Sequence, residues 1–107
     1  MKYGYVRDRL GGEQGIEKQK KMIGEVDTII ADTDKSKLRV LLENIKQGDS
    51  IHISDMSRIT RNIYESIQLY EYLSKKGAEL YINREKFKPI SDEISCLLTM
   101  TNVDKEN

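Results

Sequence analysis

The sequence contains a single cysteine, a single histidine, a single proline and no tryptophan. Because a disulfide needs two thiols, Cys96 alone excludes an internal disulfide, and no Cys-x-x-Cys pair offers a zinc site. His52 has no His or Cys partner at ligand spacing, so we expect a structural role for it rather than metal binding. We therefore expect no metal and no cofactor, and a lone thiol fits a reducing cell interior.

Long apolar runs and a net charge are also missing. No segment approaches the roughly 20 apolar residues that a membrane helix needs, and the N-terminus has no apolar signal-peptide core. The 18 Lys and Arg residues equal the 18 Asp and Glu residues in number, so no general basic field favours loose DNA binding. The sequence therefore predicts a cytoplasmic protein without a membrane partner, in which any anion site is local.

What the sequence does contain is an alternation of strand-like and helix-like segments. Its 107 residues, 37% of them apolar, suit one compact domain. Periodicity predicts strands at residues 3–6, 26–31, 51–53 and 78–83, and helices at 13–23, 38–45, 63–77 and 91–100. This order indicates an α/β fold, a mainly parallel sheet with helices on both faces.

Specific residues mark the ends of these elements. Asp32 and Asp34 supply turn and N-cap chemistry before the second helix, and Gly48 is the expected left-handed C-cap after it. Asn62 and Glu65 can form a capping box at the start of the third helix. Residues 84–89 are expected to form a loop, and residues 101–107 a frayed tail.

Three arginines follow the predicted strands. Arg58 and Arg61 are three residues apart where the third strand gives way to a helix, and Arg7 ends the first strand. The carboxyl ends of neighbouring parallel strands share one edge, where ligands collect. Guanidiniums beside a helix N-terminus can bind a phosphate, so these residues predict an anion site. The alternative is solvated surface charge paired with nearby carboxylates, namely Glu13, Asp55 and Glu65.

Four short motifs occur in order along the chain: Tyr3-Gly-Tyr-Val-Arg7, Glu17-Lys-Gln19, Gln47-Gly-Asp49 and Asp55-Met-Ser-Arg-Ile-Thr-Arg-Asn62. Together they resemble the catalytic domain of serine recombinases, the resolvase and DNA-invertase family, over nearly the whole chain. The resemblance implies a three-layer, Rossmann-like domain at residues 1–100 with a mainly parallel four-stranded sheet. It also implies DNA strand exchange, in which a serine attacks a phosphodiester and forms a 5′-phosphoserine link.

The same resemblance implies the residues of the site. By the family pattern, the catalytic groups that match are Arg7, Arg58, Arg61 and Gln19. Planar guanidiniums suit this chemistry because a phosphoryl transition state gains negative charge on its equatorial oxygens. The three arginines are therefore also the expected phosphate-binding residues.

The nucleophile is the main departure from the family pattern. Arg9 stands where the attacking serine is expected, and no serine occurs before Ser36. An arginine stays protonated and has no lone pair with which to attack phosphorus. The sequence therefore predicts phosphate binding without cleavage, unless another nucleophile such as Ser36 takes over.

Other segments also differ from the family. The loop between Ala31 and Leu38 is shorter than the family's mobile loop, and Lys35 is its nearest basic substitute, hence a further candidate for phosphate binding. One residue is inserted around Gly11 and Gly12. A helix-turn-helix recognition domain is expected to be absent, so DNA binding should be weak.

Two functions of different classes remain open. The favoured one is a serine-recombinase catalytic domain that is inactive as written. The alternative is a non-catalytic regulatory or dimerising module that binds DNA phosphates or an active recombinase. In the family the last helix pairs subunits, so a homodimer through residues 91–100 is expected. A third reading, an enzyme for a small phosphorylated ligand, lacks a Gly-rich phosphate loop or a carboxylate pair to support it.

Overall fold

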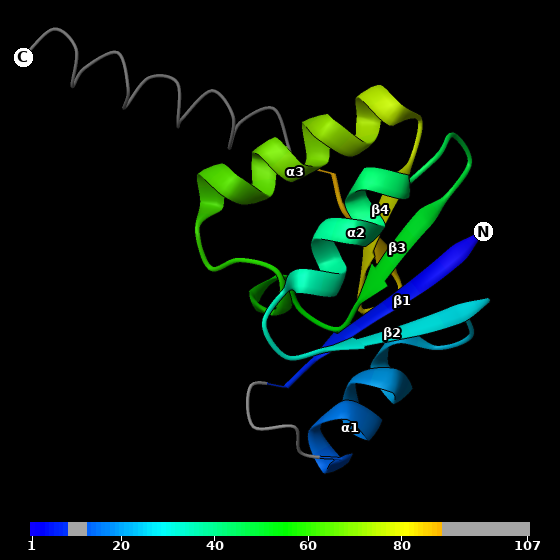
Figure 1. Ribbon diagram of the computed structural model, residues 1–107, viewed down its shortest axis with the longest axis vertical. Helices are drawn as coiled ribbons and strands as arrows, with labels where there is room; N and C mark the ends of the chain where they lie inside the picture. The colour runs from blue at the N-terminus through cyan, green and yellow to red at the C-terminus, as the bar shows by residue number, and fades with distance from the viewer. Residues whose placement is uncertain (9–12, 89–107) are drawn as a thin grey trace, which may run out of the picture.

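The computed structural model describes residues 1–8 and 13–88 of the chain. These residues form one five-stranded sheet and three α-helices (Figure 1). In chain order the elements are β1 (Lys2–Arg7), α1 (Glu13–Ile23), β2 (Thr28–Asp32), α2 (Ser36–Asn44), β3 (Ser50–Ile53), the 3₁₀ turn η1 (Met56–Arg58), α3 (Ile63–Lys76), β4 (Glu79–Ile82) and β5 (Glu85–Lys86). The order across the sheet is β2-β1-β3-β4-β5, and only the β4–β5 pair is antiparallel.

The helices cover the two faces of the sheet unequally. α1 lies against one face, whereas α2 and α3 lie against the other (Figure 1). The main core forms between the sheet and the helix pair. Its buried strand residues are Tyr5, Ile51, Ile53 and Leu80, and its buried helix residues are Leu38, Leu41, Leu69 and Leu73. This confirms the predicted α/β architecture with helices on both faces.

A glycine allows close packing on the α1 side of β1. A Cβ atom built on Gly4 would lie 2.6 Å from Ile29 Cδ1 and 3.0 Å from Val26 Cγ2. It would also lie 3.6 Å from Cγ2 of Ile23, the last residue of α1. Because no side chain stands at Gly4, α1 and the chain leading into β2 can pack directly on the strand.

The sheet has one strand more than the four that the sequence predicts. β5 lies in the segment expected to be a loop, residues 84–89, and pairs antiparallel with β4. The turn between the two strands places Asn83 and Arg84 at φ angles of 48° and 71°. Two consecutive residues with positive φ reverse the chain tightly enough for a hairpin. The sequence did not reveal this turn because neither residue is glycine.

The ends of α2 also differ from the expectation. The helix ends at Asn44, followed by Ile45 in an extended conformation, so Gly48 is not its C-cap. Gly48 has a φ of 88° and lies in the turn before β3, where its N–H donates to the carbonyl of Gly77. Its left-handed conformation therefore serves the turn into the strand.

The ends of α3 follow the prediction closely. Asn62 Oδ1 accepts from the N–H groups of Tyr64 and Glu65, and Gly77 ends the helix with a φ of 75°. The capping box is only half formed, because the Glu65 carboxylate accepts from the Thr60 hydroxyl and not from the Asn62 N–H. The Asn62 N–H in turn donates to Thr60 Oγ1 at 3.0 Å. Thr60 thus ties the start of α3 to the turn before it.

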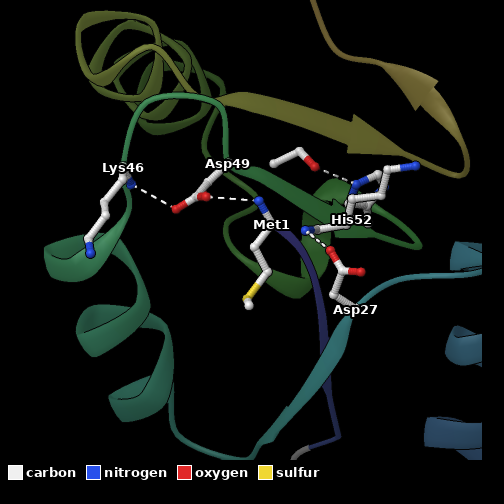
Figure 2. A network of polar contacts seen from close by, with 7 residues as sticks. Met1, Asp27, Lys46, Asp49 and His52 are labelled. Carbon is white, nitrogen blue, oxygen red and sulfur yellow. Dashed lines mark hydrogen bonds and ion pairs between the residues drawn. The ribbon is translucent and has the colours of Figure 1, made fainter.

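The amino ends of the strands carry a polar network (Figure 2). The Met1 amino group lies 3.0 Å from Asp49 Oδ1, and the Lys46 N–H donates to the other oxygen of this carboxylate. On β3, Ser50 Oγ lies 2.8 Å from His52 Nε2, and the His52 ring stacks on Tyr81. These contacts are consistent with the structural role expected for His52.

Several expectations fall on residues outside the described part of the chain. These are the position of Arg9, the insertion at Gly11 and Gly12, the helix at 91–100 and the tail at 101–107. Within residues 1–8 and 13–88, no helix has the length and apolar character to cross a membrane.

Candidate functional site

The carboxyl ends of β1 and β3 bring Arg7 and Arg58 together, although they are 51 residues apart in sequence. Arg7 Nε donates to the backbone carbonyl of Arg58 at 2.9 Å. In return, Arg58 Nη1 lies 3.5 Å from the backbone carbonyl of Arg7. A second contact at 3.5 Å joins Arg7 Nη1 to the carbonyl of Thr33, in the loop after β2. Arg7 therefore links the loops that follow three neighbouring strands.

Gln19 holds the backbone of Arg7 from the α1 side. Its side chain is only 2% exposed, and its amide pairs with Arg7 in both directions. The Arg7 N–H donates to Gln19 Oε1, and Gln19 Nε2 donates to the Arg7 carbonyl, each at 2.9 Å. A buried amide satisfied at both ends fixes its partner strongly, because breaking either bond would leave a buried polar group without a partner. α1 thus sets the position of Arg7.

Arg58 is presented by the short turn η1. Asp55 caps this turn, and its Oδ1 accepts from the Ser57 N–H at 2.7 Å. Hydrogen bonds from Ser57 lower the pKa of Asp55, and the charges of Arg58 and Arg61 lower it further. Among the described residues, buried Arg58 Nε has no hydrogen-bond partner. This nitrogen is enclosed by protein atoms, while Arg58 as a whole is only partly buried.

Arg61 lies beside this pair without joining it. No hydrogen bond connects its guanidinium to Arg7 or Arg58 in the described part of the chain, and its side chain is exposed. It lines a hollow of about 440 Å³ at the start of α3, together with Asp55, Ser57 and Asn62. The N–H groups of Tyr64 and Glu65 at this helix end already donate to Asn62, so the guanidinium of Arg61 is the group here that favours negative charge. Arg61 thus lies at the start of α3, in a hollow that neither Arg7 nor Arg58 lines.

Lys35 is in a different place. It precedes α2 with a φ of 70° and lines a groove between α2 and α3, together with Arg39, Thr60 and Tyr72. No contact joins it to Arg7 or Arg58 among the described residues. Its left-handed conformation directs the chain into the helix, so its role in the fold is the turn itself.

Asp32 is a site residue that sequence reasoning treated only as a turn residue. It is 4% exposed and pairs in register with Arg7 across β1 and β2. Its Oδ2 accepts from the Tyr5 hydroxyl at 3.1 Å and from the N–H groups of Lys37 and Leu38 at the start of α2. Burial raises the pKa of Tyr5, and the bond to Asp32 raises it further. The signal that could have found Asp32 is its place at the end of a parallel strand, the same edge as Arg7.

Serine hydroxyls near this edge differ in exposure, and Ser57, directly before Arg58, is partly exposed. Ser54 Oγ follows β3 but is buried, with the residue 4% exposed. Ser36, named above as a possible replacement nucleophile, donates its hydroxyl to Asp34 Oδ1 at 2.7 Å. In the described residues no group of three or more His, Cys, Asp or Glu side chains could hold a metal ion.

A family model described as "Resolvase, N terminal domain" matches residues 6–106 of this sequence. The chain belongs to the resolvase N-terminal domain family. No curated protein matches it. Membership confirms the resemblance read from the motifs and associates this resolvase domain with DNA recombination. The match runs through the ends of β1 and β3, so the Arg7–Arg58 pair lies within the resolvase domain proper.

Proposed function

We propose that this resolvase domain binds DNA phosphates through Arg7, Arg58 and Arg61 and does not cleave the strand. The observation that carries the proposal is the contact between Arg7 and Arg58 at the shared edge of β1 and β3, where Arg58 is only partly buried. Guanidiniums match the planar geometry of phosphate oxygens and bind them through charge-assisted hydrogen bonds. Gln19 supports this role because it fixes the backbone of Arg7.

The absence of cleavage follows from the nucleophile position. Arg9 occupies the place of the family's serine, and a guanidinium can bind a phosphate but cannot form a covalent link to it. Of the serines near the edge, Ser54 is buried, Ser36 donates to Asp34 and Ser57 is partly exposed, and the family pattern gives none of them the role of nucleophile. We infer a domain that keeps the charge-stabilising part of the recombinase site without its reactive part.

Binding is tested by titrating a labelled DNA duplex with the protein at low salt and following fluorescence anisotropy. Arg58→Ala removes the guanidinium and its 3.5 Å contact to the Arg7 carbonyl but leaves the shorter bond from Arg7 Nε, because that bond uses the backbone carbonyl of Arg58. We expect the affinity to fall roughly 10- to 150-fold, since a hydrogen bond to a charged group contributes roughly 1.5 to 3 kcal/mol.

The matched control is Lys75→Ala, which removes one exposed positive charge near the end of α3. This residue lies about 18 Å along α3 from the sheet edge that carries Arg7 and Arg58, which we call the arginine edge. It should leave the affinity nearly unchanged. Equal losses in both variants would show that only total charge matters, and the arginine edge would then not be the phosphate site.

Cleavage is tested with supercoiled plasmid DNA, followed by a search for protein linked to a 5′ end. We expect no covalent product from the native sequence. We also expect little or none from Arg9→Ser, because the β2–α2 loop departs from the family as well. A covalent adduct with the native protein would refute the proposal and direct attention to another serine.

Association with a second copy is a further part of the proposal. The apolar residues Leu97, Leu98 and Met100 support it by their spacing, although they lie outside the described residues. Exposed apolar side chains at the start of α3 also support it, since Ile63 is 51% and Tyr64 49% exposed. Size-exclusion chromatography over a concentration series should show a dimer, and a monomer at all concentrations would contradict this part.

A further inference from the structure

A strained arginine lies at the turn of the β4–β5 hairpin. Arg84 has a φ of 71°, a left-handed conformation that costs free energy for any residue with a side chain. Glycine or asparagine is the usual choice for such a position in a hairpin turn. The neighbouring position follows this preference, with Asn83 at a φ of 48°. We therefore expect contacts of the Arg84 side chain to offset the cost of its left-handed backbone.

The side chain of Arg84 clamps the end of α1. Its Nη2 donates to the carbonyl of Lys21 at 2.8 Å, and its Nε lies 3.3 Å from the carbonyl of Met22. These are carbonyls of the last turn, which have no partner inside the helix. The cation also faces the negative end of the helix dipole. The two contacts bridge more than 60 residues of sequence, so the hairpin at the β4–β5 edge of the sheet holds the end of α1.

The end of α1 is shaped to accept this clamp. Gly24 follows the helix with a φ of 85°, and a Cβ built there would lie 3.1 Å from Arg84 Nε. The glycine thus both ends the helix and leaves room for the guanidinium. One turn earlier on the same helix is Gln19, the residue that brackets the backbone of Arg7. Arg84 and Arg7 are therefore joined through a single rigid element.

We propose that Arg84 is a positioning residue for the arginine edge, the sheet edge at Arg7 and Arg58, and that it acts through α1. By clamping the last turn of the helix, Arg84 holds Gln19 in place, and Gln19 holds Arg7. Among the described elements, α1 is the one helix on its face of the sheet, so it has no neighbouring helix to fix its position. The proposal rests on the proposed phosphate binding, but its structural part can be tested without DNA.

The test compares two glycine variants in the same turn. Arg84→Gly removes the clamp while relieving the strain, so the hairpin should keep its shape. Asn83→Gly is the matched control, because it relieves strain at the adjacent position and keeps both the clamp and the backbone bond from Asn83 to Ile53. The first readout is hydrogen exchange of the Arg7 backbone N–H, measured by NMR without DNA. The N–H of Ile51 in β3 serves as the reference for global opening.

We expect the Arg7 N–H to exchange about tenfold faster in Arg84→Gly than in Asn83→Gly, as for local opening after the loss of a hydrogen bond. The Ile51 N–H should exchange at nearly the same rate in both. Arg84→Lys, which keeps the charge and one donor, should fall between them. Unchanged Arg7 exchange, or equal acceleration at Arg7 and Ile51, would overturn the proposal.

The second readout is DNA affinity, measured as for Arg58→Ala. Arg84→Gly should weaken binding several-fold relative to Asn83→Gly, with partial recovery in Arg84→Lys. If the native protein binds no DNA but Arg7 exchange still responds to Arg84, the phosphate function fails and the positioning role stands. If DNA binds equally well in both glycine variants, Arg84 does not position the arginine edge.

Discussion

The two arginines at the centre of the edge have different roles despite their shared chemistry. Arg7 donates to one backbone carbonyl at 2.9 Å and lies 3.5 Å from a second, so much of its guanidinium serves the protein itself. Arg58 keeps a buried Nε without a partner in the described residues. Arg7 therefore connects the loops that shape the edge, whereas the Arg58 guanidinium lies 3.5 Å from the Arg7 carbonyl.

The linking role of Arg7 predicts a larger loss of stability on substitution than at exposed Arg61. Arg7→Ala should lower the free energy of unfolding by about 1 to 3 kcal/mol, because carbonyls of the β2–α2 loop and of η1 lose their donor. Arg61→Ala should change it by no more than about 0.5 kcal/mol, as expected for an exposed side chain. Urea unfolding followed by circular dichroism measures both. An equal effect of the two substitutions would contradict the linking role of Arg7.

His52 gives a second prediction at this scale. Burial lowers the pKa of His52 from its usual 6.5, and the charge of Lys2 lowers it further. Below pH 6.5 the His52 imidazole therefore binds a proton more readily in the unfolded chain than in the folded protein. The free energy of unfolding should stay level above this pH and fall as the pH drops below it.

Urea unfolding at pH 7.5 and pH 5.5 tests this, with His52→Gln as the comparison. The variant should lose most of the difference between the two pH values. The carboxylates Asp49 and Asp55, whose pKa values are lowered by hydrogen bonds, titrate at more acidic pH and do not interfere. A pH dependence that is unchanged in His52→Gln would assign the effect to another group.

At the scale of elements, the site depends on helix ends. The N-terminus of α2 is capped by the buried carboxylate of Asp32, and that of α3 by Asn62. The end of α1 is held by Arg84. Asp32 and Asn62 belong to segments next to the arginine edge. Arg84 belongs to the β4–β5 hairpin, which contacts α1, the helix that carries Gln19. The helix ends are therefore part of how the edge is built.

The cap of α3 can be tested by a single substitution. Asn62→Ala should lower the free energy of unfolding by about 1 kcal/mol, because the N–H groups of Tyr64 and Glu65 lose their acceptor. Gln68→Ala, an exposed substitution in the middle of the same helix, should have little effect. Chemical denaturation measures both, and a neutral Asn62→Ala would mean that the Thr60–Glu65 contact alone fixes the helix start.

At the scale of the whole molecule, the charges balance, with 18 basic and 18 acidic side chains. Such a molecule has no general attraction for DNA, so binding must come from a few placed cations. The salt dependence of affinity counts them. With three arginines on phosphates, the slope of log affinity against log salt should be about −3.

This slope is measured by repeating the anisotropy titration at several salt concentrations. Arg61→Ala should make it shallower by about one. A slope twice as steep would show that other cations, such as the lysines of α1, also contact the duplex. A flat slope would mean that the interaction does not involve phosphates.

Features that depend on neighbouring residues could be predicted from the amino-acid sequence. The bounds of α1, the caps Asn62 and Gly77 of α3 and the α/β alternation all follow from local spacing and local hydrogen bonding. The family motifs likewise lie in short stretches. These features could be predicted because their partners are a few residues away along the chain.

The tertiary structure alone decided how distant segments meet. In the folded protein the guanidinium of Arg7 contacts carbonyls of two loops, and the buried carboxylate of Asp32 caps α2. The strand β5 pairs with β4, and Arg84 contacts the end of α1. The physical reason is that hydrogen bonds to backbone carbonyls do not depend on the identity of the accepting residue. No pattern of side chains along the chain can therefore indicate which carbonyl an arginine will reach.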